Sequence, residues 1–426
     1  MVPTGTVVAV TDATSSPDPR TSRTTYSEVL RVPEFRALFA ARTVSITAIS
    51  LRILAVSVLV LEATDSPLMS GLAFGIGFFP QIVGGMTLLS LADRLRPRRA
   101  LVLGSLLEAA AALVIVLAGL PPWAVLVLLA ATAVLAPVFT AAANGLVPEL
   151  LTGDRYVLGR SLLTMSSSAS QIAGLALGGV AIALLDPRGA LVLSCVLHLV
   201  SAAVARLSLA DRPGRRAKAA RGTVRETWTG NRSLLGDRRI RGQVLVQTVP
   251  PALVTGAEGL VVAYVAATHL PDGAAGPLLA CLPIGMAVGN LAVGRFLAPD
   301  ARERAALPLL LVLGLPLLLF FASPPLVVSA ALLLVTGVAF AYELGVQRRF
   351  LESVPEAMRG QAFGLVGTLM MFGQGMAPVL FGALASLWSP SIAIGLCGVT
   401  VLLAAAALTS HLKVAGVPAE VAPTVS

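Results

Sequence analysis

Charged residues are scarce in this sequence. Of its 426 residues, 12% are Asp, Glu, Lys or Arg, whereas 56% are hydrophobic. Soluble domains carry about 25% charged residues, which cover the surface that faces water. A water-soluble fold is therefore excluded. The apolar residues come in blocks of roughly 20, the length of a helix that crosses a bilayer. The sequence thus predicts an all-α membrane protein that crosses the bilayer many times.

Cysteine and histidine are rare as well, with three residues of each. Cys195, Cys281 and Cys397 lie singly in apolar runs, where a free thiol behaves as a small hydrophobic group. We therefore expect no disulfide, no metal site and no cofactor. The sequence has no nucleophile–His–Asp order and no Gly-x-x-x-x-Gly-Lys-Ser/Thr loop, so we expect neither an enzyme nor direct use of ATP. Aromatic residues make up only 5%, and no aromatic cage for cations is evident.

Apolar runs between charged, proline or glycine residues predict about twelve membrane-spanning helices. The predicted spans are 37–62, 67–91, 98–119, 121–147, 157–185, 188–208, 242–268, 273–297, 304–322, 324–347, 359–387 and 389–411. The longest polar interval divides them six and six. We therefore predict a six-helix bundle over 33–208, a basic linker over 209–241 and a second bundle over 242–412. Residues 1–32 and 413–426 are expected to be disordered tails.

The net charge of +9 follows from where the arginines lie. One set of alternate loops holds Arg94 to Arg99, Arg155, Arg160 and the arginines of 212–241, 295–304 and 348–359, whereas the other set holds Arg188 alone. Short basic loops stay in the cytoplasm. We expect a multi-pass protein of the plasma membrane with both termini cytoplasmic. Topology accounts for the basicity, so no nucleic-acid partner is expected.

Two stretches of the sequence repeat one another. Val-Pro-Glu occurs at 147–149 and again at 354–356. Downstream of the first copy, Gln171, Gly179 and Pro187 are spaced eight and eight. Gln374, Gly382 and Pro390 repeat that spacing. Matches at equivalent places in two six-helix halves indicate an internal duplication, which is how many secondary transporters are built.

The segment "LADRLRPRRAL" at 91–101 resembles the loop motif of the major facilitator superfamily, Gly-x-Leu-Ala-Asp-Arg-x-Gly-Arg-Arg. Leu89 stands at the first glycine and Arg96-Pro97 at the second. "AGLALGG" at 173–179 resembles the Gly-Pro-x-x-Gly-Gly stretch of antiporters in that family, with Leu175 at the proline. "PEFRALFAAR" at 33–42 and "VPE…RGQAFGL" at 354–365 resemble the enterobactin-exporter-like branch of drug and metabolite exporters. The resemblance covers about residues 33–410.

The resemblance implies a cytoplasmic latch made by Asp93, Arg94, Arg98 and Arg99. A helix N-terminus carries about half a positive charge, and we expect Asp93 to dock on the helix that begins near Arg359. The alternative is that these residues only set topology, with Asp93 a partner for Arg94.

Ionisable residues in the middle of membrane helices are the leading functional candidates, because each is costly unless paired or hydrated. Arg52 lies about ten residues into an apolar stretch of the first span, and Glu258 lies at similar depth in the seventh. We predict that these two form a pair across the halves, with Glu258 exchanging the coupling proton and Arg52 controlling it. A static buried ion pair is the alternative.

Further polar residues within the spans are weaker candidates. Glu108 is either a proton site or a fastening to the Ser-rich segment of the fifth span. Asn144, Gln171, Gln247 and Gln374 either face a substrate cavity or join helices by hydrogen bonds. At the cytoplasmic ends we predict two structural ion pairs, Glu149–Arg160 and Glu343–Arg348.

From the resemblance, we expect a secondary transporter that exports a small amphiphilic drug or metabolite in exchange for protons. Its partners would be the small-molecule substrate, protons and the lipid bilayer, and we expect a monomer. Two alternatives stay open: uptake of a small solute, and a non-transporting membrane sensor or binding protein on the same scaffold.

Overall fold

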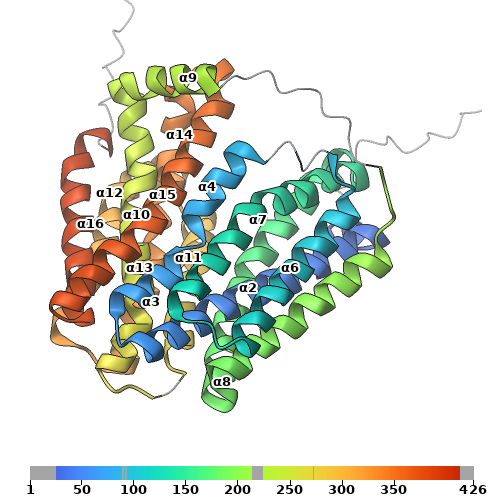
Figure 1. The fold of residues 1–426 in the computed structure, drawn as a ribbon. Helices are drawn as coiled ribbons and strands as arrows, with labels where there is room; N and C mark the ends of the chain where they lie inside the picture. Colours follow the sequence, from blue (N-terminus) through green and yellow to red (C-terminus); the bar gives the residue numbers. More distant parts are fainter. Residues whose placement is uncertain (1–24, 89–90, 92–93, 214–223, 272, 413–426) are drawn as a thin grey trace, which may run out of the picture.

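The computed structural model describes residues 25–88, 91, 94–213, 224–271 and 273–412. Within these ranges every regular element is a helix (Figure 1). The predicted all-α membrane fold is therefore confirmed. Asp93 of the predicted latch lies outside the described residues.

The first half of the chain forms a short α1 and then six membrane-crossing stretches, which we call the N half. Its helices are α1 (Tyr26–Leu30), α2 (Pro33–Thr64), α3 (Pro67–Gly75), α4 (Phe78–Thr87), α6 (Pro97–Leu117), α7 (Pro122–Leu150) and α8 (Gly153–Ser208). Proline is the first residue of all of these from α2 to α7 except α4, as expected at a position whose backbone N–H needs no partner.

The second half repeats this plan after one additional helix, and we call its membrane helices the C half. Its elements are α9 (Val224–Gly236), α10 (Arg238–Ala267), α11 (Ala275–Phe296), α12 (Pro299–Leu318), η1 (Leu319–Ala322), α13 (Leu326–Ala339), α14 (Tyr342–Ser353), η2 (Glu356–Met358), α15 (Arg359–Leu387) and α16 (Pro390–Leu412). Helix α9 lies inside the predicted linker, which is therefore partly helical.

Eleven stretches of the described chain are long and apolar enough to cross a membrane, and α8 is one of them. This helix is broken at Asp186, whose backbone adopts φ 64° and ψ 173°. The Asp186 carboxylate accepts hydrogen bonds from the backbone N–H groups of Arg188 (2.7 Å) and Gly189 (2.9 Å). Because Asp186 caps a new helix that begins at Pro187, α8 is long enough to cross twice, and the described residues form the twelve crossings expected.

The two halves touch most closely near the ends of α3 and α11, at what we call the distal end. A side chain on Gly71 would place its Cβ 2.6 Å from the backbone oxygen of Pro378. At a second contact, a Cβ on Gly276 would lie 2.5 Å from the backbone oxygen of Leu175. The repeat-related Gly179 and Gly382 each face the opposite half, against Gly276 and Leu68 respectively. Small residues therefore allow backbone contact between the halves at equivalent places, as the internal repeat leads one to expect.

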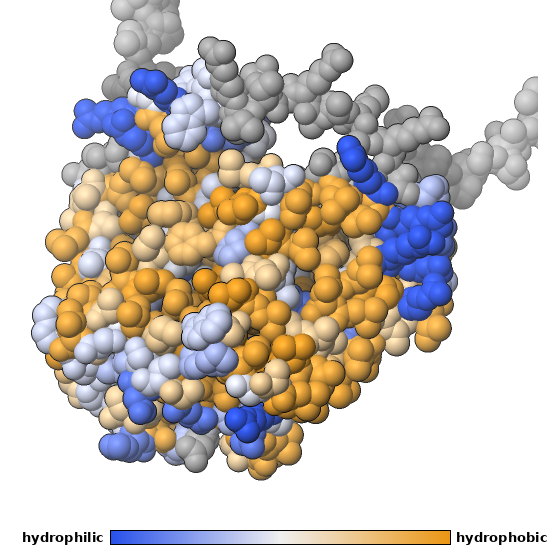
Figure 2. Space-filling view, viewed as in Figure 1, coloured by the Kyte–Doolittle hydropathy of each residue, from blue (hydrophilic) through white to orange (hydrophobic). Residues whose placement is uncertain are grey.

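The opposite end, which carries α1 and α9, we call the linker end. Here the two groups of helices diverge in Figure 1. Each ion pair found among the described residues joins two groups of the same half, so none bridges the halves at this end. Backbone contacts thus join the halves at the distal end, whereas no ion pair among the described residues joins them at the linker end. Figure 2 shows an apolar middle surface with hydrophilic residues gathered toward the two ends, as in a protein surrounded by lipid.

Candidate functional site

Arg52 lies in the middle of α2 and forms an ion pair with Glu108 of α6. Its Nη2 is 2.8 Å from the Glu108 Oε2, and the two side chains are only 8% and 15% exposed. Helix α8 packs along both α2 and α6, so the pair closes beside α8 within the N half. The predicted Arg52–Glu258 pair is therefore wrong for this conformation. The buried Arg52 guanidinium is neutralised instead by Glu108, a carboxylate of the same half.

His198 of α8 lies beside this ion pair, and sequence reasoning missed it. The imidazole is fully buried, and neither ring nitrogen has a hydrogen-bond partner. Arg52 is close enough for its charge to act on the ring. Two serines on the same face of α8 bond to α2: Ser194 Oγ to Ala48 O and Ser201 Oγ to Ala41 O, both 2.9 Å. The spacing of Ser194, His198 and Ser201 in an apolar helix is the signal that could have identified this polar seam.

Glu258 lies in the middle of α10 and has no ion-pair or hydrogen-bond partner among the described residues, although it is half-buried. Its neighbours Gly256 and Gly259 press against α15, where a Cβ would lie 2.5 Å from the Phe381 ring and 2.7 Å from Pro378. At about 100° per residue, Glu258 projects from a different face of α10 than these glycines. Gln247 lies three turns earlier on the same face of α10 as Glu258. Its side-chain amide donates to the backbone oxygen of Gln243, one turn before it in the same helix (3.1 Å).

Asn144 of α7 joins two helices by accepting a hydrogen bond from Arg42 of α2 (Nη1 to Oδ1, 3.0 Å). This outcome matches the helix-joining alternative. Arg42 was not among the predicted residues, because it follows a basic, linker-end segment and is easily assigned to topology. Arg160 of α8 is near enough for its charge to act on Arg42. The Arg160 side chain is exposed, and the predicted Glu149–Arg160 clamp stays a prediction.

Gln171 and Gln374 occupy repeat-related positions on α8 and α15, and neither forms a hydrogen bond with a described side chain. Gln171 is exposed and Gln374 is half-buried. Both stay predictions as substrate contacts.

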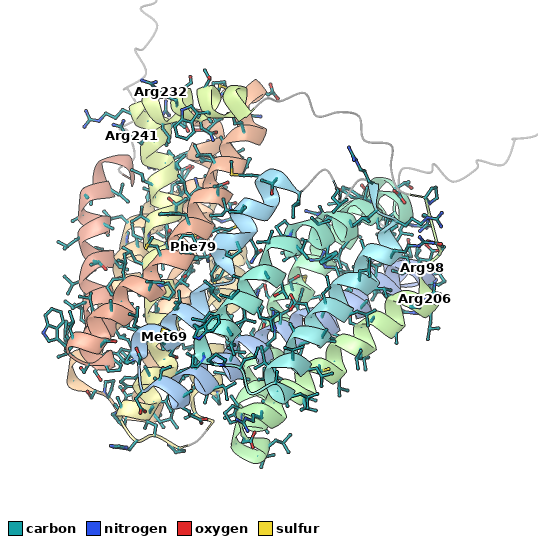
Figure 3. All side chains as sticks on the ribbon, in the orientation of Figure 1. Met69, Phe79, Arg98, Arg206, Arg232 and Arg241 are labelled. Atoms are coloured by element: carbon teal, nitrogen blue, oxygen red, sulfur yellow. The ribbon has the colours of Figure 1, made fainter. Side chains whose placement is uncertain are left out.

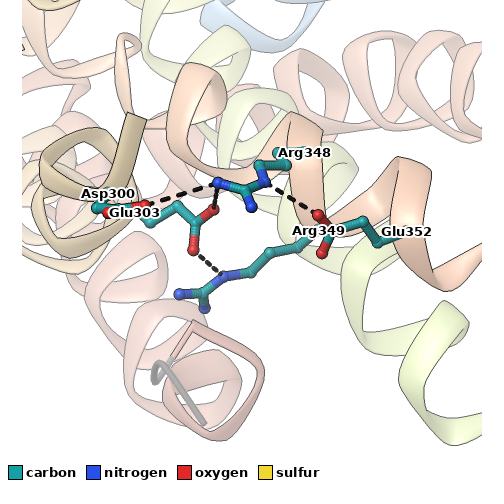
Figure 4. A network of polar contacts seen from close by, with 5 residues as sticks. All are labelled: Asp300, Glu303, Arg348, Arg349 and Glu352. Atoms are coloured by element: carbon teal, nitrogen blue, oxygen red, sulfur yellow. Dashed lines mark hydrogen bonds and ion pairs between the residues drawn. The ribbon is translucent and has the colours of Figure 1, made fainter. Parts of the chain in front are cut away.

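Arg348 belongs to a different network from the one predicted (Figure 4). Its guanidinium lies 2.9 Å from Glu352, 3.6 Å from Asp300 and 3.7 Å from Glu303. Arg349 also pairs with Glu303, at 3.0 Å. The network joins the start of α12 to the end of α14. Glu343 takes no part in it, because α14 begins at Tyr342 and places Glu343 more than one turn from Arg348, on the membrane side. The predicted Glu343–Arg348 pair is therefore wrong.

Two arginines of the predicted latch, Arg98 and Arg99, gather with Arg96 around one aspartate of the N half. Arg96, Arg98 and Arg99 lie 2.8, 3.3 and 3.9 Å from the Asp211 carboxylate. Partial desolvation raises the pKa of Asp211, but the Arg96 hydrogen bond and the three positive charges outweigh it, so the pKa is lowered overall. Figure 3 shows Arg98 at this linker-end corner of the N half. Arg94 is exposed and its role stays a prediction.

Comparison with known proteins identifies the fold. The family model described as Major Facilitator Superfamily matches residues 38–346. Among solved structures, the nucleoside transporter NupG superimposes with a TM-score of 0.71 at 12% identity, covering 89% of this chain and 99% of that one. A bacterial homologue of the human lysosomal transporter Spinster, inward-facing and unoccupied, gives 0.71 at 14% identity, covering 91% and 98%. A peptide transporter POT in complex with sulfate gives 0.64 at 14% identity, covering 88% and 94%. No curated protein sequence matches the chain significantly.

Proposed function

The chain belongs to the Major Facilitator Superfamily, and from this premise we propose that it exports a small amphiphilic compound in exchange for protons. The family and the fold identify a secondary transporter rather than an enzyme. The substrate class, the direction and the coupling ion are our proposal. It follows the resemblance of residues 33–42 and 354–365 to exporters of drugs and metabolites.

The observation that carries the proposal is the isolation of Glu258. An ionisable group inside the membrane is costly unless it is paired, hydrated or neutralised by a proton. Arg52 is already neutralised by Glu108 in the other half. Glu258 is left without a charged partner among the described residues, on a half-buried face of α10. A carboxylate in this position is suited to take up and release a proton as its surroundings change.

The arrangement of the halves supports alternating access. With the distal end closed by the Gly71–Pro378 and Gly276–Leu175 contacts, we expect the substrate to reach the site from the linker end. We place the linker end in the cytoplasm because it holds nearly all of the loop arginines. An exporter would load its substrate in this conformation and then rock about the site to open the distal end.

The residues that face the site suit an amphiphilic substrate. Gln247 and Glu258 lie on one face of α10, and most of the residues between them are apolar. A compound with one polar or cationic group on an apolar body would satisfy such a surface.

A first experiment tests the activity itself. Cells with and without the chain are compared for accumulation of a panel of antibiotics and dyes, at two external pH values and with an uncoupler. Export predicts lower accumulation in cells that carry the chain, and loss of the difference with the uncoupler. Higher accumulation would indicate uptake instead, and no difference across the panel would contradict the proposal.

A second experiment tests the proton carrier in proteoliposomes with a substrate found in that panel. Glu258→Gln should abolish uphill, proton-driven transport but still permit exchange of substrate down its gradient. Glu343→Gln is the matched control, because Glu343 is also a half-buried carboxylate of the C half without an ion-pair partner among the described residues. Retained, pH-dependent uphill transport in Glu258→Gln would refute the role of Glu258, and loss only in Glu343→Gln would transfer it to Glu343.

A further inference from the structure

Helix α9 (Val224–Gly236) is not a membrane span but lies crosswise over the linker end of the C half (Figure 1). One face is fixed to the protein. Leu234 is 1% exposed and packs in a cluster with Ile240, Val244 and Phe350. The side-chain amide of Gln361 in the first turns of α15 donates to Asn231 Oδ1 at 3.0 Å. The helix therefore has a defined place at the level where the bundle leaves the membrane.

The neighbouring face of α9 carries a large apolar side chain outward. Trp228 is 72% exposed. Among the described residues, a hollow of ≈ 320 Å³ is lined by Trp228, Asn231, Arg232, Leu235 and Gly236, which follow one another at helical spacing. A tryptophan so exposed is unfavourable in water, whereas its amphipathic ring is favoured at the headgroup level of a bilayer.

Arg232 of α9 and three arginines in the first turn of α10 form no ion pair with a described carboxylate. Arg232, Arg238, Arg239 and Arg241 are all exposed. Within the part of the chain that the structure describes, no ion pair involves any of them; Arg241 donates only to the Leu235 backbone oxygen (3.3 Å). The nearby Asp237 carboxylate is used to cap α10, accepting from the backbone N–H groups of Arg239 and Ile240. Figure 3 shows Arg232 and Arg241 at this corner of the molecule.

A cluster of arginines at the linker end of the N half, in contrast, has a carboxylate partner within the protein. Arg96, Arg98 and Arg99 converge on the Asp211 carboxylate. A protein-supplied anion thus serves that cluster, whereas the arginines around α9 are left for an anion from outside.

We propose that the outward face of α9, with Trp228 in the hollow and Arg232, Arg239 and Arg241 around it, is a binding site for an anionic phospholipid headgroup. Guanidinium groups bind phosphate oxygens in bidentate fashion, and tryptophan settles beside the glycerol region of the same lipid. Each arginine close to an anionic membrane surface strengthens binding about fivefold, or about 1 kcal/mol. The site is independent of what the protein transports.

The test uses Trp228 as its own reporter in the full-length protein. The chain has three tryptophans, and the other two, Trp123 and Trp388, are 65% and 61% exposed, so Trp123→Phe and Trp388→Phe leave a single-tryptophan protein. It is reconstituted in phosphatidylcholine nanodiscs in which the mole fraction of lipid brominated near the headgroup is varied. The brominated lipid is either phosphatidylglycerol or phosphatidylcholine. We expect brominated phosphatidylglycerol to quench Trp228 at several-fold lower mole fraction than brominated phosphatidylcholine.

Three comparisons decide the outcome. The preference should disappear when Arg232, Arg239 and Arg241 are all changed to Gln, and it should survive Arg206→Gln, which removes an exposed arginine from the linker end of the N half (Figure 3). In the single-tryptophan protein itself, 0.5 M salt should weaken the preference, because screening then acts within about 4–5 Å. Equal quenching by the two lipids would show ordinary surrounding lipid only. Absence of quenching would place α9 in water. A lipid preference unaffected by loss of the three arginines would show that other residues cause it. Each of these results overturns the proposal.

Discussion

Breaking the Arg52–Glu108 ion pair should destabilise the N half more than any surface substitution. The side chains are 8% and 15% exposed, and the 2.8 Å contact is the only polar interaction of the Arg52 guanidinium among the described residues, since Nε and Nη1 have no partner. Removing one member of a buried pair leaves an uncompensated charge and costs about 3–5 kcal/mol. We expect Glu108→Leu to reach the upper end of that range. Glu108→Gln, which keeps an acceptor oxygen, should lie near the lower end.

The double variant separates this pairing from a general need for polar groups. Replacing both residues, as Arg52→Met with Glu108→Leu, removes the charge and its partner together and should bring the free energy of unfolding back to within about 1 kcal/mol of the wild type. The measurement is unfolding of the purified protein in mixed micelles with increasing denaturing detergent. Glu343→Leu, which removes a half-buried carboxylate without an ion-pair partner, is the matched control and should cost less than about 1 kcal/mol. A double variant as unstable as the sum of the two single variants would refute the reasoning.

Three further predictions concern the distal contact and the two linker-end networks. Gly276→Val should hinder closure of the distal end, because its Cβ would lie 2.5 Å from the Leu175 oxygen. Ser386 lies at this end, where its Oγ accepts a hydrogen bond from the backbone N–H of Leu68 in the other half (3.3 Å), so a cysteine placed there should react faster with a maleimide in the Gly276→Val protein. Gly364→Val is the control and should leave the rate unchanged, because the space around Gly364 is open. Glu303→Gln removes contacts to both Arg348 and Arg349 and should lower the free energy of unfolding by about 1–3 kcal/mol. Asp300→Asn should lower it by less than about 0.5 kcal/mol, because the Asp300 side chain is 78% exposed. The pKa of Asp211 is lowered from its ordinary value of 3.8. Its contact with the arginines should therefore be fully present at about pH 5 and be lost only as the pH falls below 3.8. A spin label attached at position 99 should therefore be more mobile at pH 7 in the Asp211→Asn protein than in the protein that keeps Asp211. In the latter, the label should gain mobility only in strong acid. Equal mobility in the two proteins at pH 7 would contradict this prediction.

The sequence alone determined the membrane spans and their number. A bilayer requires about 20 consecutive apolar residues wherever a helix crosses it, and this demand is local, so it can be read from composition. The predicted span 359–387 has the same bounds as α15, and the predicted break between 185 and 188 is found at Asp186. The repeat of Gly179 and Gly382 also predicted a real equivalence, because both glycines allow close contact with the opposite half.

Only the tertiary structure decided which charges meet. Arg52 and Glu258 lie at similar depth in their helices, and depth was the information that the sequence offered; which side each residue faces depends on how the helices rotate and pack. Packing of α8 against α2 and α6 brings Arg52 into contact with Glu108 and buries His198 beside them. The orientation of α14 places Arg348 against Glu303 of α12 and not against Glu343. Hydrophobic length fixes where a helix crosses the membrane, but the partner of a buried charge is fixed by contacts between residues far apart in the chain.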